Sequence, residues 1–185
     1  MDLATVFENW GIEITSFECV RDMFGYVLSS YPFNCFYIDT CPQSVCSGKY
    51  EQSCSVWYNY RVFKHRNRAY ISNENKFVTF MRTMWLYNDT RLVECSLSEK
   101  ALKKVGLAQN TRTTCLDDVE VVESLLRYSL RHELEEVCFL LSDMSLLIFP
   151  MGTCLLLFAR NTSPVTLSLI EKIANVSGLF LRSHN

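Results

Sequence analysis

The sequence predicts an α+β fold in which a five-stranded, mostly antiparallel sheet is flanked by helices. Apolar residues recur at helical spacing in several segments, and short runs rich in β-branched and aromatic residues lie between them. The chain has 185 residues, of which 49% are hydrophobic and 21% charged, as in a globular domain. Because no linker or internal repeat divides it, we expect a single domain over residues 1–185.

The first half of the chain shows both kinds of pattern. Thr15 and Glu18 have the spacing of a capping box, and the apolar residues behind them predict a helix over Ser16–Ser29. A proline after Tyr31 ends this helix. Two aromatic and β-branched runs then predict strands at Phe33–Asp39 and Cys54–Phe63, with Ala69–Ile71 as a short extension of the second.

The middle of the chain is predicted to be mainly helical. A helix is expected over Asn75–Tyr87 and a strand over Arg91–Cys95. Ser96 and Glu99 then form a capping box for a short helix that Gly106 closes, and a polar loop follows. A longer helix, capped by Asp117 and Glu120, carries the apolar stripe Val122, Leu126, Leu130, Leu134 and Val137. We therefore expect residues 96–141 to form a helical insertion before the last elements.

The last quarter contains the clearest hairpin. Two nearly continuous apolar runs, Met144–Phe149 and Thr153–Ala159, flank Pro150-Met151-Gly152, which supplies the turn. Because these strands lack polar alternation, both of their faces should be covered. Ser163 caps the final helix, with a proline at its first position and Gly178 at its end.

This order of elements is similar to that of roadblock and related longin-type small domains. The matching parts are Ser16–Ser29, Phe33–Phe63, Asn75–Tyr87, Arg91–Cys95, Met144–Ala159 and Ser163–Val176, and the best match is the apolar hairpin that runs into the last helix. The departure is the stretch 96–141. The resemblance implies dimerisation through a continuous sheet and a helix pair, and scaffolding of small GTPases or motors.

Two surface sites are candidates. The first is a large, soft apolar stripe that would suit a partner helix if exposed, or would belong to the core if buried, and it consists of Phe77, Phe80, Met81, Met84 and Trp85. The second is a basic cluster next to the aromatic hairpin Trp57–Arg68, which could bind phosphates or guard a sheet edge, and it consists of Arg61, Lys64, His65, Arg66 and Arg68.

The nine cysteines do not favour one function. Four of them lie in one region of the sequence, namely Cys35, Cys41, Cys46 and Cys54. They could hold a structural zinc ion, but their spacings of five, four and seven intervening residues differ from those of zinc knuckles. A thiol-rich core edge and loop is the alternative that we favour, so we expect no metal and no cofactor.

No catalytic motif accompanies these features, and the net charge of −2 excludes a general basic field. The hypothesis is therefore a non-enzymatic interaction or scaffolding subunit of a larger complex, with a protein partner in a hetero- or homo-oligomer. The alternative is a nucleic-acid-binding module that uses the hairpin Trp57–Arg68. The sequence shows neither a signal peptide nor a membrane span, so we expect a cytoplasmic or nuclear protein without membrane insertion.

Overall fold

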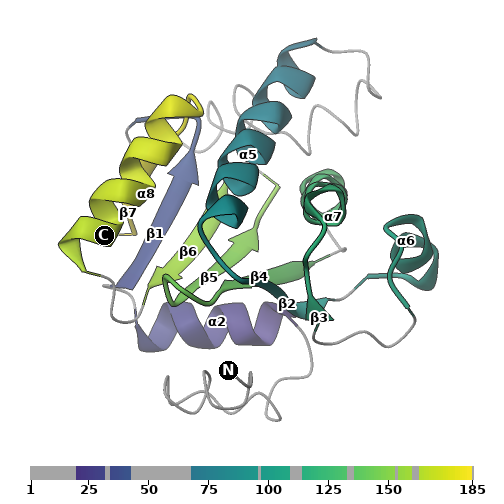
Figure 1. Ribbon diagram of the computed structural model, residues 1–185. Helices are drawn as coiled ribbons and strands as arrows, with labels where there is room; N and C mark the ends of the chain where they lie inside the picture. The colour runs from purple at the N-terminus through teal and green to yellow at the C-terminus, as the bar shows by residue number, and fades with distance from the viewer. Residues whose placement is uncertain are drawn as a thin grey trace.

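A computed structural model of the protein describes residues 20–31, 34–42, 68–95, 97–108, 114–132, 136–152, 154–159 and 163–184. In these residues a single sheet of seven strands is flanked by five helices (Figure 1). The strands are β1 (Cys35–Asp39), β2 (Thr90–Cys95), β3 (Thr114–Cys115), β4 (Val137–Leu141), β5 (Leu146–Pro150), β6 (Leu155–Ala159) and β7 (Phe180–Ser183). The helices are α2 (Val20–Ser30), α5 (Arg68–Leu86), α6 (Glu99–Lys104), α7 (Val119–Arg131) and α8 (Pro164–Val176).

The sheet has the strand order β3-β2-β4-β5-β6-β1-β7, and each neighbouring pair is antiparallel. The α+β class and the antiparallel sheet are thus confirmed, but the prediction of five strands was wrong. Strands β3, β4 and β7 were not predicted. The predicted strand Cys54–Phe63 lies outside the described residues.

Strand β4 changes the interpretation of the middle of the chain. The predicted stripe of the long helix continued to Val137, whereas α7 ends at Arg131 and Val137 begins β4. All five residues of β4 are buried, and the strand pairs with both β2 and β5. A continuously apolar run of this length suits a central strand with two covered faces. The stretch 96–141 is therefore not a purely helical insertion, because it supplies a strand to the middle of the sheet.

Helix boundaries also differ from the prediction. The residues Ala69–Ile71, predicted as a strand, form the first turn of α5, which starts at Arg68 rather than at Asn75. The buried face of α5 continues back to Glu74, whose carboxylate binds arginines of α7, so a tertiary contact extends the helix.

The caps of two helices lie one or two residues from the predicted positions. Helix α6 is capped by Ser98, whose Oγ accepts a hydrogen bond from Ala101 N at 3.3 Å, whereas the predicted cap, Ser96, lies outside the described residues. Helix α7 is capped by Asp118, whose Oδ1 accepts from Glu120 N at 2.8 Å. In both places two residues suited to capping stand within two positions of each other, and the sequence does not rank them.

The sheet is covered on both faces, as the apolar hairpin predicted. One face packs against α5, α7 and α8, and the other packs against α2, which crosses beneath the sheet in Figure 1. Alternate residues of one strand serve the two cores: Leu147 of β5 faces α2, whereas Ile148 belongs to the larger core. All five positions of β5 and all five of β6 are buried.

Two buried carboxylates tie distant segments together. Glu74 of α5 is fully buried and pairs with Arg127 and Arg131 of α7. Asp39 of β1 is also fully buried and pairs with Arg182 of β7, which brings the C-terminal strand against the sheet edge. Each buried charge is thus balanced by a guanidinium, the side chain best suited to a carboxylate in a partly dry site.

Candidate surface depression at the end of helix α5

The predicted partner-binding stripe lies inside the molecule. Phe77, Phe80, Met81 and Met84 are fully buried in the larger core, and Trp85 is half-buried at its edge. These four side chains cannot meet a partner at the surface of this chain, because they already pack against the sheet and α7. The core alternative that the sequence left open is therefore the one found.

The surface beyond this stripe is apolar at the end of α5. Leu86 and Tyr87 follow the stripe directly, and their side chains are 71% and 58% exposed. Leu86 contributes to an open depression of about 340 Å³ that is lined by Trp85, Leu86, Asn88, Asp89, Thr90, Leu116 and Asp117, and Tyr87 stands between two of these lining residues in the sequence. Large apolar residues that stay in contact with water cost free energy, so two in succession beside a concave surface mark a candidate contact site.

The floor of the depression is fixed by a hydrogen bond. The indole Nε1 of Trp85 donates to the backbone carbonyl of Leu116 at 2.7 Å, which joins the end of α5 to the segment between β3 and α7. Leu116 N donates in turn to Thr90 O at 2.9 Å, and this bond holds the same segment against β2. The apolar surface is therefore held by one side-chain and one backbone hydrogen bond, which join the segment around Leu116 to the end of α5 and to β2.

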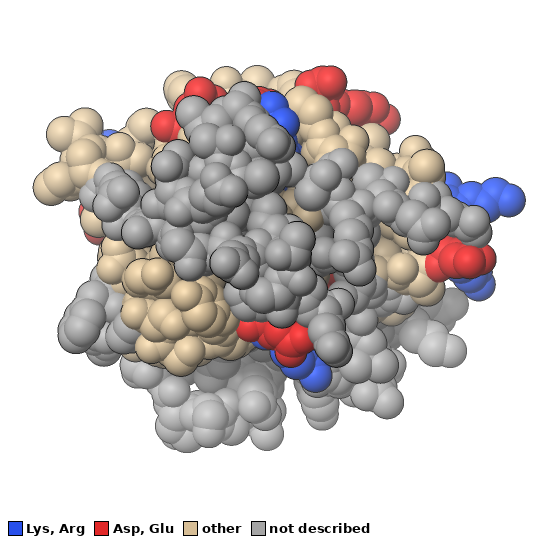
Figure 2. All heavy atoms as spheres, turned by 90° about the horizontal axis from the view of Figure 1, so that it is seen from below, with Lys and Arg blue, Asp and Glu red and all other residues tan. Residues whose placement is uncertain are grey.

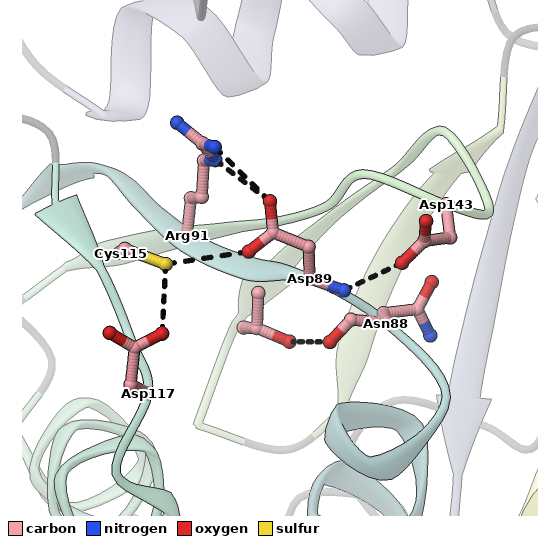
Figure 3. A network of polar contacts seen from close by, with 7 residues as sticks. Asn88, Asp89, Arg91, Cys115, Asp117 and Asp143 are labelled. Carbon is pink, nitrogen blue, oxygen red and sulfur yellow. Dashed lines mark hydrogen bonds and ion pairs between the residues drawn. The ribbon is translucent and has the colours of Figure 1, made fainter. Parts of the chain in front are cut away.

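A polar network, here called the rim, includes the lining residues Asp89 and Asp117 together with Arg91, Cys115 and Asp143 (Figure 3). The thiol of Cys115 lies between two carboxylates and donates to Asp117 Oδ1 at 3.1 Å and to Asp89 Oδ1 at 3.4 Å. Asp89 also pairs with Arg91 at 3.1 Å, and its backbone N–H donates to Asp143 Oδ2 at 2.6 Å. All three carboxylates are exposed, and Asp89 is the one that pairs with the Arg91 guanidinium.

These carboxylates control the chemistry of the thiol. The hydrogen bond to Asp117, partial burial and the hydrogen bond to Asp89 together raise the pKa of Cys115 from 9.0 to about 11. A thiol of this kind is almost entirely protonated at neutral pH, whereas the nucleophile and metal ligand is the thiolate. The arrangement therefore makes Cys115 exposed but unreactive.

The predicted basic patch is mostly outside the described residues. Arg61, Lys64, His65 and Arg66 fall there, and Arg68 is the exposed first residue of α5. Figure 2 shows both basic and acidic side chains among the described residues of one face. Binding of nucleic acid through this patch stays a prediction.

The cysteine cluster is only partly described. Cys35 is buried between β1 and α2, where its Sγ donates to Tyr31 O at 3.3 Å and burial raises the pKa of the thiol to about 11. Cys41 follows β1 and is half-buried, whereas Cys46 and Cys54 lie outside the described residues. Within the described part of the chain, no group of three or more His, Cys, Asp or Glu side chains could hold a metal ion. Likewise, no described helix is long and apolar enough to cross a membrane.

The sequence contains a signal for an exposed apolar surface at the end of α5. Leu86 and Tyr87 fall outside the spacing of the buried stripe, so two large apolar residues had no place on the inner face of α5. The sequence contains no such signal for the rim. Asp89 and Asp117 are 28 residues apart and come close to each other only through the pairing of β2 with β3.

Comparisons with protein-family models, with curated proteins and with solved structures found no significant match for this chain. Its function is therefore inferred from its own residues.

Proposed function

We propose that this chain is a non-enzymatic protein-interaction subunit of a larger intracellular complex. The observation that carries the proposal is the pair Leu86 and Tyr87, which are consecutive in the sequence and exposed, and of which Leu86 lines a preformed depression. Apolar and aromatic side chains grouped around a concave surface are typical of the buried centre of protein interfaces. A partner that covered them would gain the free energy of removing this apolar area from water.

The chemistry around the depression supports binding over catalysis. Its lining contains no histidine, cysteine or lysine among the described residues, and the neighbouring thiol of Cys115 is held in its protonated form. An activated nucleophile needs a base within hydrogen-bond reach or a lowered pKa. Cys115 has carboxylates that raise its pKa instead, so the network stabilises a surface and generates no reactive group.

The contact formed by Leu86 and Tyr87 is tested with a pull-down from native lysate after nuclease treatment, followed by mass spectrometry. We expect a stoichiometric protein partner that survives nuclease and moderate salt, and that is lost when the bait carries Leu86→Ser with Tyr87→Ser. The matched control carries Val165→Ser with Val176→Ser on α8, whose side chains are 79% and 88% exposed. All baits should share one melting temperature, because each substitution is at the surface.

Each outcome has a distinct meaning. Loss of every partner on nuclease treatment would replace the proposal with nucleic-acid binding through the Trp57–Arg68 hairpin. A second copy of this chain as the retained partner would support the dimerisation that the roadblock resemblance implies. Retention of the partner by the Leu86 and Tyr87 variant would keep the interaction function and reject this surface, whereas absence of any stoichiometric protein partner would reject the function.

A further inference from the structure

On the basis of the proposed function, we infer that the depression binds a short segment of another protein that presents a large apolar side chain together with a nearby Lys or Arg. The apolar side chain would lie against Leu86 and the ring of Trp85, both of which line the depression, with the exposed Tyr87 next to Leu86 in the sequence. The cation would lie against the carboxylates of Asp89 and Asp117. This inference specifies the chemistry of the partner, which the proposed function leaves open.

The size and rigidity of the apolar part favour a short linear segment. A volume of about 340 Å³ is at the lower end of the range for ligand sites, and the depression is open rather than enclosed, which suits a side chain presented from a neighbouring surface. The ring of Trp85 is already fixed by its bond to Leu116 O, so binding does not have to order it. A preformed hydrophobic floor beside two exposed apolar residues is therefore ready to receive one anchoring side chain.

The rim adds a charge preference. Asp89, Asp117 and Asp143 carry three negative charges, and Arg91 is the cation that pairs with one of them. Asp117 and Asp143 form no salt bridge within the described part of the chain, and both are exposed. Of the two carboxylates that line the depression, Asp89 is paired with Arg91, so the negative charge of Asp117 is in excess there and should favour a positively charged segment and disfavour an acidic one.

A second role for Asp117 must be separated from this one. Asp117 precedes Asp118, the N-cap of α7, where negative charge also stabilises the helix dipole. A purely structural role would affect the melting temperature of the protein when Asp117 is changed. It would not make the affinity for a basic peptide depend on Asp89, which lies on a different element. The test therefore changes both residues and measures both properties.

Cys115 provides a readout inside the site. Its thiol donates to the two carboxylates that would receive the cation, and these carboxylates raise its pKa to about 11. A bound Lys or Arg would offset their negative charge and allow the thiolate to form at lower pH. Binding in the proposed position should therefore lower the pH at which Cys115 is alkylated, whereas binding elsewhere on the protein should leave it unchanged.

The experiment is a selection from a phage-displayed library of random dodecapeptides on the purified protein, which does not depend on knowing the natural partner. We expect enriched peptides with an aromatic or large aliphatic residue and a Lys or Arg within about four positions, an arrangement that reaches both parts of the site. Asp89→Asn with Asp117→Asn should weaken the selected peptide at least about five-fold, as expected for two exposed charge pairs. Leu86→Ser with Tyr87→Ser should abolish binding.

The control is Glu99→Gln with Glu171→Gln, which removes the same amount of charge from α6 and α8. Equal weakening by this control would show a general effect of net charge and overturn the inference. Enriched peptides without basic residues, or binding that leaves the alkylation of Cys115 unchanged, would also overturn it. These outcomes are independent of the pull-down, so failure of the peptide chemistry can be distinguished from failure of the interaction function.

Discussion

Glu74 of α5 and Arg131 of α7 are joined by two hydrogen bonds, from Nε to Oε2 at 2.7 Å and from Nη2 to Oε1 at 2.6 Å. The carboxylate is fully buried, and Arg127 binds it from the same helix as Arg131. Helices α5 and α7, which pack on one face of the sheet, are thus joined by a buried ion pair within an otherwise apolar contact. Such a point constrains how α5 can slide along α7, because a displaced Glu74 would be left buried without a partner.

We expect Glu74→Gln to lower the free energy of unfolding by about 2–3 kcal/mol, because it removes charge-assisted bonds while the two partly exposed arginines can still reach water. The matched control is Glu123→Gln, which breaks the more exposed pair with Arg82 between the same two helices. This control should cost about 1 kcal/mol or less. Urea unfolding measures both, and equal losses would contradict the role given to burial.

The pair between Asp39 and Arg182 predicts a larger effect at the sheet edge. Arg182→Gln leaves the fully buried carboxylate of Asp39 without a countercharge, so it should cost about 3–5 kcal/mol. Adding Asp39→Asn to this variant should restore part of the loss, because no buried charge then remains. The control Arg91→Gln affects the exposed pair with Asp89 and should cost about 1 kcal/mol or less. Thermal or urea unfolding of the four proteins tests this, and a double variant no more stable than Arg182→Gln would refute the explanation.

The thiol of Cys115 predicts a specific pH dependence. Since its pKa is raised from 9.0 to about 11, the protonated form is favoured in the folded state. Its contribution to stability is complete below pH 9 and is lost as the pH rises through about 11. Alkylation by iodoacetamide should therefore be slow at pH 8 and should increase with a midpoint near pH 11, as measured on the peptide that contains Cys115.

The same measurement distinguishes the effects of the neighbouring carboxylates on the pKa of Cys115. Asp117→Asn should move the midpoint for Cys115 to lower pH, because it removes the largest cause of the raised pKa. Asp143→Asn should move it much less, because that carboxylate accepts from Asp89 N and does not contact the thiol. Identical profiles for the wild type and Asp117→Asn would show that this hydrogen bond does not set the pKa.

The two cores predict that neither face of the central hairpin tolerates truncation. Leu147→Ala removes contacts with α2, and Ile148→Ala removes contacts in the larger core, so each should cost about 2–5 kcal/mol. Leu86→Ala is the control at an exposed position and should change stability by about 0.5 kcal/mol or less. A tolerated Leu147→Ala would mean that α2 does not stabilise its face of the sheet.

The sequence by itself determined the α+β class, several helices, and the C-terminal hairpin with both faces covered. These features depend on local signals: the spacing of apolar residues, the Ser163 cap and the turn after Phe149. The sequence also indicated that Phe77 and its neighbours form one stripe. Whether that stripe faced the core or a partner could not be known, because both environments select the same apolar residues.

Only the tertiary structure determined the order of the strands in the sheet and the position of the candidate site. Strand β4 resembled the continuation of a helix until its pairing with β2 and β5 placed it at the centre of the sheet. The rim of the depression brings Asp89 and Asp117 to one thiol through the pairing of β2 with β3. Such contacts between distant segments cannot be read from the spacing of residues in the sequence. Spacing reports only the local helix or strand, whereas the packing of the whole chain determines which residues meet.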